Sequence, residues 1–365
     1  MDGSDLLIMI PGPTGLPPEV REALARPQIG HRTPEFAALI ADCTAGLQYV
    51  FRTANDLLIL TASGTGGMEA AVTNCLSPGD PVLAVSVGNF GERLGTIAEV
   101  FGANVTWVRS EWGEAADASA VREALAKGNY KAVLFTQNET STAITNPVAE
   151  LAALAREAGA LTIVDAISGM GGTEIRTDAW GLDVVVAGSQ KALMLPPGLA
   201  FVSVSPQAWQ AAEAARMPRF YFDLRKAKES LEKGQTPYTP NTSLFVALQV
   251  SLNMLRAEGL ENAWARHAEC ARMIRQGVQK LGLRLFGDPR YASNVVTAFY
   301  PPEGVDPKLI RNHLRDHHNI LITGAQGRYR GTFLRIGHLG TIDREQCEQV
   351  LAALEDALNA VKPSG

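Results

Sequence analysis

The chain has 365 residues, of which 46% are hydrophobic and 19% charged, a composition typical of globular proteins. This length is sufficient for two domains of ordinary size. The formal net charge of −5 provides no overall basic surface for nucleic acid or anionic membranes, so an anionic ligand would need a local positive site.

Targeting and metal signals are not expected in this sequence. The beginning, MDGSDLLIMIPGP, lacks the basic segment and the long apolar run of a secretory signal, and the ending KPSG is not a peroxisomal address. Apolar stretches such as residues 57–60 are far shorter than the ~18–20 residues that span a bilayer. We therefore expect a cytoplasmic protein. Its cysteines show no metal-ligand spacing, and no metal is expected: Cys43, Cys75, Cys270 and Cys347.

Apolar runs alternate with Ala/Glu/Arg-rich segments over the first two thirds of the chain. A Pro/Gly-rich arm (residues 1–16) precedes a helix that we expect to begin near Pro17. Strands are expected at 57–62, 81–87, 104–110, 131–137, 161–167, 182–189 and 199–205, with helices at 66–76, 90–101, 118–128 and 148–159. Continuous apolar runs are typical of strands covered on both faces, and their alternation with helices favours a parallel sheet. Residues 17–260 are thus predicted to form a large α/β domain, with a mainly parallel seven-stranded sheet and helices on both faces.

The pattern changes after about residue 206. Helical segments dominate to about residue 281, including 243–259 and 261–282. Strand-like pieces follow at 294–300 and 332–340, with helices around 306–317 and 343–361. This order predicts a smaller C-terminal α+β domain, residues 261–365.

Two charged residues adjoin strand patterns. Asp165 lies in the apolar run 161–167, and α/β sheets place their ligands at the carboxyl ends of strands. Lys191 follows the run 182–189 and precedes Ala-Leu-Met-Leu-Pro-Pro. Desolvation disfavours the charged form of a lysine, so its amine becomes available to form a Schiff base. The structural alternatives are a helix cap for Asp165 and an ordinary surface position for Lys191.

Three further features could bind a ligand. Residues 63–67, Ser-Gly-Thr-Gly-Gly, lie between a strand and a helix, where backbone amides and hydroxyls can hold a phosphate; a small-residue helix start is the alternative. Phe90 follows the run 81–87 and could either stack on a planar ring or anchor a helix in the core. Arg335 interrupts an apolar strand pattern, which favours either carboxylate binding or an internal salt bridge.

Together these segments resemble the class V aminotransferases, fold-type I enzymes that use pyridoxal 5'-phosphate (PLP). Within this family the chain is most similar to alanine–glyoxylate and serine–glyoxylate (serine–pyruvate) aminotransferases. The resemblance covers nearly the whole chain in order: PGPTGLPP, GLQYVF, SGTGGMEAA, GNFGER, NETSTA, VDAISGMGG, AGSQKALMLPPG, GLENAWARH and LRIGHLG.

The resemblance implies a role for each matching residue. Lys191 would form the Schiff base with PLP, and Asp165 would pair with its pyridine nitrogen. Arg335 would bind the substrate carboxylate, with the backbone of Gly12 nearby. The remaining implied contacts are Ser63, Gly64 and Thr65 to the phosphate, Phe90 stacked on the ring, Thr140 and Gln190 at the ring substituents, and Thr239 from the other subunit of a homodimer.

The sequence departs from the family pattern at two places. Phe90 stands where some glyoxylate enzymes have tryptophan, which reduces the stacking area. Thr236 stands three residues before Thr239, where a tyrosine is expected, so one phosphate contact across the dimer is in doubt; nearby Tyr238 could replace it. His31 receives no role.

The implied reaction moves an amino group from alanine or serine to glyoxylate or pyruvate by ping-pong kinetics, with Lys191 as both base and acid. No second basic side chain for a distal carboxylate is evident, which disfavours aspartate and glutamate. A cysteine desulfurase or another PLP-dependent lyase is an alternative, but Cys270 and Cys347 fall in helical patterns rather than on a loop. A nucleotide-dependent oxidoreductase is disfavoured by the missing GxGxxG segment. A non-catalytic subunit is disfavoured by the intact set of Lys191, Asp165 and Arg335.

Overall fold

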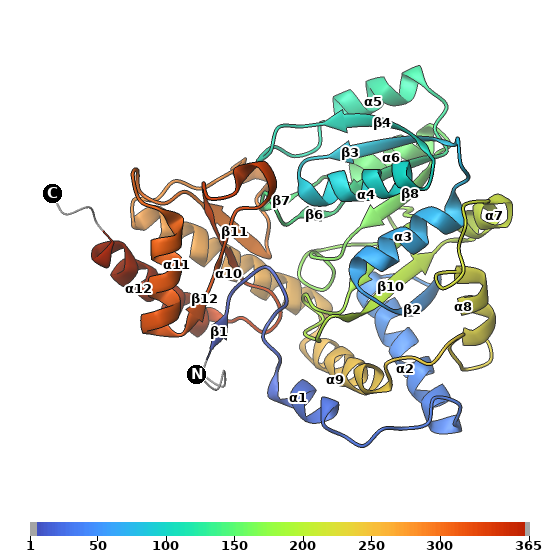
Figure 1. Cartoon of the computed structure of the whole chain (residues 1–365), viewed down its shortest axis with the longest axis horizontal. Coiled ribbons are helices and arrows are strands. Elements are labelled where there is room, and N and C mark those ends of the chain that lie inside the picture. The colour runs from blue at the N-terminus through green and yellow to red at the C-terminus, as the bar shows by residue number, and fades with distance from the viewer. Residues whose placement is uncertain (1–5, 362–365) are drawn as a thin grey trace.

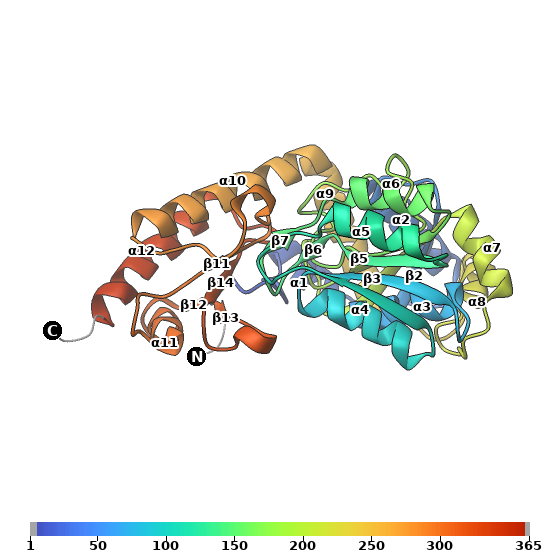
Figure 2. The same cartoon turned by 90° about the horizontal axis from the view of Figure 1, so that it is seen from above.

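The computed structural model describes residues 6–361 (Figure 1). Residues 1–5 of the expected arm and residues 362–365, the KPSG ending, lie outside the described residues. Seen from above, a larger α/β body lies beside a smaller body formed by C-terminal residues (Figure 2). Within residues 6–361, no helix is both long and apolar enough to cross a membrane.

A seven-stranded sheet forms the centre of the larger body. Its strands are β2 (Asp56–Ala62), β3 (Pro81–Ser86), β4 (Asn104–Arg109), β5 (Ala132–Thr136), β8 (Leu161–Asp165), β9 (Val184–Gly188) and β10 (Gly198–Val204). The order is β2-β10-β9-β8-β5-β3-β4, and only β10 runs antiparallel to its neighbours. Each strand coincides with an apolar run of the sequence, so the prediction of a mainly parallel seven-stranded sheet is confirmed.

Residues along the central strands alternate between two hydrophobic clusters. In β9, Val185 and Ala187 belong to the first cluster, and Val184 and Val186 to the second. Successive side chains of a strand point to opposite faces, so burial on both faces requires an uninterrupted apolar run. The first face is covered by α1 (Pro18–Leu24), α2 (Pro34–Phe51), α5 (Ala118–Lys127), α6 (Val148–Glu157) and α9 (Thr242–Glu258), and the second by α3 (Gly64–Cys75), α4 (Asn89–Val100), α7 (Pro206–Ala214) and α8 (Leu224–Leu231).

Local sequence signals set where many of these helices begin. The Asp117 carboxylate accepts hydrogen bonds from the N–H groups of Ser119 and Ala120 in the first turn of α5. The Thr33 hydroxyl accepts the N–H of Phe36 in α2, whose first residue is Pro34. Because such caps satisfy N–H groups that have no partner within the helix, they determine where α2 and α5 start.

The smaller body has its own core. Its elements are α10 (Leu260–Lys280), β11 (Val296–Phe299), α11 (Pro307–His318), β12 (Ile320–Leu321), β13 (Thr323–Gly324), β14 (Leu334–Gly337) and α12 (Arg344–Ala360). A three-stranded antiparallel sheet, in the order β11-β14-β13, packs on the helices through a cluster that includes Ile274, Ile310, Ile336 and Leu354. The short hairpin of β6 (Asn138–Glu139) and β7 (Ile144–Thr145) and the 3-10 turns Pro289–Tyr291 and Gly327–Tyr329 complete the fold.

The N-terminal arm contacts both bodies. Strand β1 (Leu7–Ile8) pairs in parallel with β12 of the smaller body. Further along, the N–H of Thr14 donates to the carbonyl of Gln190 at 3.2 Å, and its hydroxyl donates to the carbonyl of Lys191 at 3.1 Å. The arm therefore connects the C-terminal sheet region to the loop that carries Lys191.

Gly337 tests how closely the arm packs on β14. Its N–H donates to the Met9 carbonyl at 2.8 Å, and a Cβ at this position would collide with the backbone of Ile10 and Pro11. We expect Gly337→Ala to lower the free energy of unfolding by about 1–3 kcal/mol, because the packed backbone cannot make room. Gly15→Ala is the matched control, since a Cβ there meets no atom within 4 Å. Equal urea midpoints for the two variants would contradict this packing.

Candidate active site

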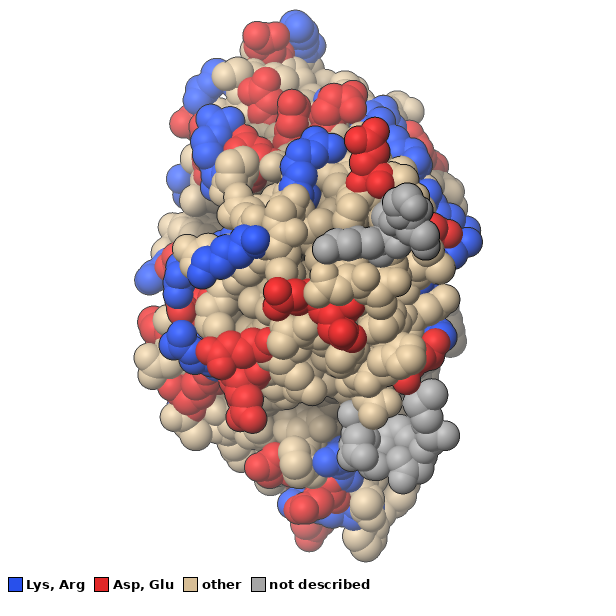
Figure 3. All heavy atoms as spheres, turned by 90° about the vertical axis from the view of Figure 1, so that its left-hand side faces the viewer, with Lys and Arg blue, Asp and Glu red and all other residues tan. Residues whose placement is uncertain are grey.

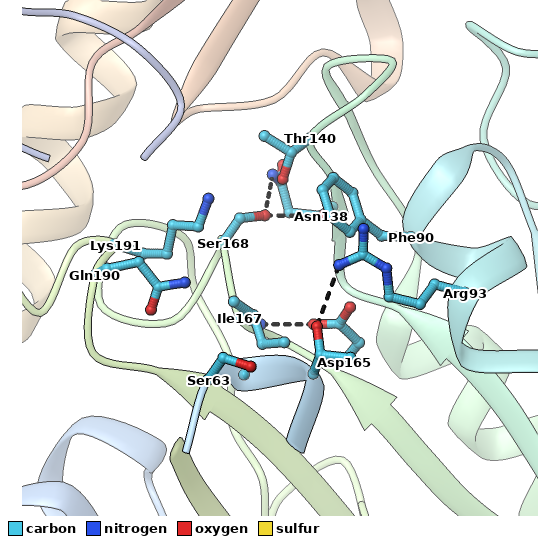
Figure 4. A pocket seen from close by; sticks show the side chains of 12 residues that line it. Ser63, Phe90, Arg93, Asn138, Thr140, Asp165, Ile167, Ser168, Gln190 and Lys191 are labelled. Carbon is cyan, nitrogen blue, oxygen red and sulfur yellow. Dashed lines mark hydrogen bonds between the residues drawn. The ribbon is translucent and has the colours of Figure 1, made fainter. Parts of the chain in front are cut away.

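A pocket lies at the carboxyl edge of the parallel strands (Figure 4). Each lining segment follows a different strand: Ser63 follows β2, Asn138 follows β5, Asp165 ends β8, and Lys191 follows β9. Strands that end at one edge bring such residues together although they are far apart in the sequence. The lining residues are Ser63, Gly64, Thr65, Phe90, Arg93, Asn138, Thr140, Asp165, Ile167, Ser168, Gln190 and Lys191.

Lys191 lies in the turn between β9 and the antiparallel β10. Its Nζ donates a hydrogen bond of 2.5 Å to the carbonyl of Pro11 in the arm. Burial lowers the pKa of Lys191 to about 8, an effect that the charge of Asp165 opposes and the charges of Arg335 and Arg93 reinforce. A larger fraction of this amine is therefore neutral near pH 8 than for an exposed lysine. A neutral amine is the form that acts as a nucleophile.

Asp165 is buried at the end of β8, with 5% of its surface exposed. Its Oδ1 accepts the N–H of Ile167 at 2.9 Å. Burial raises the pKa of Asp165 to about 7, although this hydrogen bond opposes the shift. Among the described residues, no cation forms an ion pair with the Asp165 carboxylate. A cationic group of a ligand would therefore find an unpaired acid at this end of the pocket.

The start of α3 supplies features of an anion site. Ser63 is the N-cap residue of α3, yet its side chain makes no capping hydrogen bond. The Arg93 guanidinium donates to Thr65 Oγ1 at 3.2 Å and lies 4.8 Å from the centre of the Phe90 ring. Free N–H groups and the positive end of the helix dipole favour an anion at a helix N-terminus, and Arg93 adds a full charge.

A buried carboxylate, Glu139, holds the aromatic wall of the pocket in place. Its Oε2 accepts the N–H groups of Phe90 and Gly91, both at 3.0 Å, in the first turn of α4. Its Oε1 accepts the N–H and the hydroxyl of Ser141 at 3.1 and 2.5 Å. Burial raises the pKa of Glu139, but all four of these partners are donors and favour the ionised form. The contacts tie Phe90 to the segment that carries Thr140.

Arg335 is almost fully buried on β14, facing the larger body. Its Nη1 donates to the carbonyl of Thr140 at 2.8 Å, and its Nε and Nη2 donate to the carbonyl of Gly324 at 3.1 and 2.9 Å. Burial lowers the pKa of Arg335 to about 10, which leaves it cationic at neutral pH. Among the described residues no carboxylate forms an ion pair with it, so the internal salt bridge considered from the sequence is absent. Its charge is held beside the pocket by neutral oxygens alone.

Gly12 and Gln190 are two further predicted site residues, and both lie near Lys191. A Cβ on Gly12 would lie 2.6 Å from Lys191 Nζ, and the backbone φ of +117° also favours glycine. The Oε1 of Gln190 is buried and has no hydrogen-bond partner among the described residues. A buried acceptor of this kind is costly unless a ligand or a water satisfies it. Among the described residues, the pocket thus has one buried acceptor that no donor uses.

Thr239 does not join this pocket. It is exposed and lines a separate hollow with Tyr221, Thr236 and Tyr238. Tyr238 stacks on Tyr221 at 5.2 Å, and the Thr236 hydroxyl donates to the Tyr238 carbonyl at 2.8 Å. The segment that contains His31 lies beside them, because Arg32 donates to the Thr236 carbonyl at 2.8 Å.

The structure adds residues that the sequence analysis does not single out. Arg93, Asn138, Ile167 and Ser168 also line the pocket. Each falls within a motif already quoted, namely GNFGER, NETSTA or VDAISGMGG, so motif membership was the available signal. From the sequence, no second basic side chain was evident that could bind a distal carboxylate of aspartate or glutamate. The structure places Arg93 in the pocket lining, so a further cation is present there.

The chain is similar to aminotransferases over most of its length. A family model described as aminotransferase class-V matches residues 19–330. The L-aspartate–glyoxylate aminotransferase of Paracoccus denitrificans is 40% identical over 92% of this chain and 86% of that protein. A protein of Anabaena cylindrica named soluble hydrogenase 42 kDa subunit is also 40% identical, over 97% of this chain and 93% of that protein. The solved structure of an alanine–glyoxylate aminotransferase from Nostoc sp. has a TM-score of 0.94 and 31% identity, covering 98% of this chain and 96% of that chain.

Replacing Asp165 with Asn should stabilise the ligand-free protein above pH 7. Burial raises the pKa of Asp165 from 3.8 to about 7, so its contribution to stability is full below pH 3.8 and is lost as the pH rises through 7. Asn cannot ionise and retains an acceptor for the Ile167 N–H. We expect a gain in the free energy of unfolding of at most about 4 kcal/mol at pH 8 that shrinks towards pH 4. Urea titrations at both pH values measure it, and an equal gain at both would contradict the assignment.

Proposed function

The chain belongs to the class-V aminotransferase family, and we propose that it uses PLP to transfer amino groups between small amino acids and keto acids. The observation that carries the proposal is the convergence, in one pocket, of the half-buried Lys191 amine and the buried Asp165 carboxylate. The start of α3 faces the same pocket with the unused hydroxyl of Ser63. These are the positions at which the chain resembles its family.

The described residues fit this cofactor group by group. The start of α3, with Ser63, Thr65 and Arg93, suits a phosphate. Asp165 suits a protonated ring nitrogen, and the unsatisfied Oε1 of Gln190 lies among the pocket residues as a further polar contact. When bound, PLP supplies an aldehyde that reacts with amines and a ring that withdraws electrons. We assign stacking on the ring to Phe90 and a polar contact to Thr140, which both line the pocket.

Lys191 performs the proton transfers in this proposal. Its lowered pKa makes the neutral amine available for covalent attachment of the cofactor. The Nζ of Lys191 would take a proton from the α-carbon of a bound amino substrate and give it back, acting as base and then as acid. Asp165 holds a proton on the ring nitrogen, because a cation facing the carboxylate favours its ionised form. Water and a second keto acid complete the two half-reactions.

Arg335 binds the substrate carboxylate in this proposal. Its guanidinium presents a planar fork of donors, and only carbonyl oxygens compete for it. Gly12 leaves room for the Lys191 side chain, which a Cβ at this position would meet at 2.6 Å from Nζ. We propose alanine or serine as donor and glyoxylate or pyruvate as acceptor. Glyoxylate appears in the names of the two aminotransferases compared above, and Arg93 makes aspartate a further donor to assay.

The alternative of a cysteine desulfurase is less supported. That reaction requires a reactive thiol near the site, whereas all four cysteines are buried. Burial raises the pKa of Cys43 and of Cys75 to about 12, so both thiols stay protonated and poorly nucleophilic. Cys270 and Cys347 lie within α10 and α12 rather than on a loop.

We further propose that two copies of the chain form a homodimer in the cytoplasm. Thr239 is exposed and outside its own pocket, as expected for a residue that completes a partner's phosphate site. Phe220 (70% exposed) and Tyr221 (46% exposed) form an apolar surface next to it. Burying such a surface against a second copy is favourable.

We also propose that the chain is divided into an arm (1–16), a large domain (17–260) and a small domain (261–365).

Lys191→Ala tests the cofactor assignment. We expect loss of the visible absorbance of covalently attached PLP and a fall in turnover of at least ~10²–10⁴, the usual contribution of a positioned base. Lys280→Ala, at the exposed end of α10, is the control and should keep both. In the wild type, the rate of covalent attachment should rise with pH around a midpoint near 8, the pKa of Lys191. Steady-state transamination by Lys191→Ala would refute the assignment.

Arg335→Lys tests carboxylate recognition, because lysine keeps the charge but loses the fork. We expect KM for alanine and serine to rise by about 10–100-fold, the worth of a charge-assisted hydrogen bond. The half-reaction with a primary amine that lacks a carboxylate should be unchanged. Arg284→Ala, an exposed arginine that stacks on Tyr300 outside the pocket, is the control. If Arg335→Lys impairs the reactions of the amino acids and of the amine without a carboxylate to the same extent, Arg335 does not bind the carboxylate.

A further inference from the structure

A cluster of histidines joins two helices of the smaller body. His313 and His318 lie on α11, and Asp356 lies on α12. The Nε2 atoms of both histidines are 2.8 Å from the same carboxylate oxygen, Asp356 Oδ2. The three possible ligand atoms all lie within 4.8 Å of one another. Three side chains from two helices, α11 and α12, thus converge on one point.

The packing of α11 and α12 holds this cluster together. The helices contact each other through the core that contains Ile310, Leu314 and Leu354. His313 is the neighbour of buried Leu314, and Asn319 ends α11 in the left-handed conformation, with φ 54°, directly after His318. Because the two backbones are fixed by their buried faces, side-chain movements alone set the final distances between the ligand atoms.

The donor set matches the chemistry of a transition-metal site. Imidazole nitrogen and carboxylate oxygen are ordinary ligands of Zn²⁺, at about 2.0–2.2 Å from the ion. Two ligands of a tetrahedral zinc ion are then roughly 3.4 Å apart. Asp356 Oδ2 therefore has to withdraw slightly from both imidazoles, and ligand atoms that lie up to 4.8 Å apart have to approach each other. Hydrogen bonds from His313 and His318 hold the pKa of Asp356 below its usual range, which keeps this ligand ionised.

A fourth possible ligand is at hand. His317 is exposed, and its ring centre lies 4.4 Å from that of His313. These two histidines are four residues apart on α11, so they lie on the same face of the helix. Neither the cluster nor His317 belongs to the pocket that contains Lys191.

We propose that His313, His318 and Asp356 form a binding site for a divalent transition-metal ion such as Zn²⁺. The ion binds Nε2 of each histidine after the proton on that nitrogen has moved to Nδ1 or to solvent, and it links α11 to α12. On this side of the molecule, acidic and basic side chains are interspersed rather than gathered into one charged field (Figure 3). Selectivity therefore comes from the nitrogen ligands, which favour Zn²⁺ over Mg²⁺. The sequence analysis considered cysteine spacing alone and expected no metal.

Isothermal titration of the full-length holoenzyme with ZnCl₂ tests the site, after removal of metals with a chelator. We expect one ion per chain, with no comparable heat from MgCl₂. His318→Gln and Asp356→Asn each remove a ligand and should weaken binding at least about tenfold, since loss of even an outer-sphere partner costs ~10–100-fold. Glu355→Gln is the matched control, because it removes an exposed carboxylate from the adjacent position of α12.

Thermal unfolding provides a second measurement on the same variants. Zn²⁺ should raise the Tm of the wild type and of Glu355→Gln, because a ligand that binds the folded state stabilises it. It should not raise the Tm of Asp356→Asn. Absence of binding in the wild type, or unchanged affinity in both His318→Gln and Asp356→Asn, would overturn the proposal and leave the cluster as a hydrogen-bonded contact between two helices.

Discussion

The burial of an amine at the carboxyl edge of the parallel sheet is the constraint on which the site depends. Lys191 can stay in this position because the Pro11 carbonyl accepts a hydrogen bond from its amine and the Asp165 charge lies in the same pocket. A desolvated amine with weak compensation has a lowered pKa, so this arrangement raises the fraction of Lys191 that is neutral. The antiparallel strand β10 matters for this reason: the β9–β10 turn directs Lys191 into the pocket.

Two helices begin at the pocket and are treated differently. The start of α3 has no capping side chain, so its first N–H groups face the pocket. The start of α4 is instead occupied by the Glu139 carboxylate, which takes the N–H groups of Phe90 and Gly91. The positive end of one helix is thus left for an anionic ligand, while that of the other is neutralised within the protein. Of these two helices, Glu139 thereby leaves only α3 with an N-terminus that no carboxylate occupies.

The sequence predicted the fold because burial on both faces leaves a direct trace: the central strands β5, β8 and β9 are buried along their whole length and are mostly apolar. Helix α2 was not predicted, although its sequence contains start signals: Thr33, Pro34 and the apolar spacing from Phe36 onwards. The contacts of Arg93 and Glu139 could not be predicted from local sequence patterns, because each residue contacts a partner far away in the chain. Arg93 reaches Thr65, and Glu139 reaches the start of α4. Separation in sequence hides such contacts until the strands are placed side by side.

The arm has a mechanical consequence. At one end it is a strand of the smaller body, paired with β12, and a few residues later it is bonded to the Lys191 loop of the larger body. Chain of this length cannot stretch, so it acts as a tether that limits how far the two bodies can separate. Any hinge movement that displaced β12 would pull on the Pro11 carbonyl and so on the hydrogen bond of the Lys191 amine. The position of the smaller body and the hydrogen bond of the Lys191 amine are therefore linked through the arm.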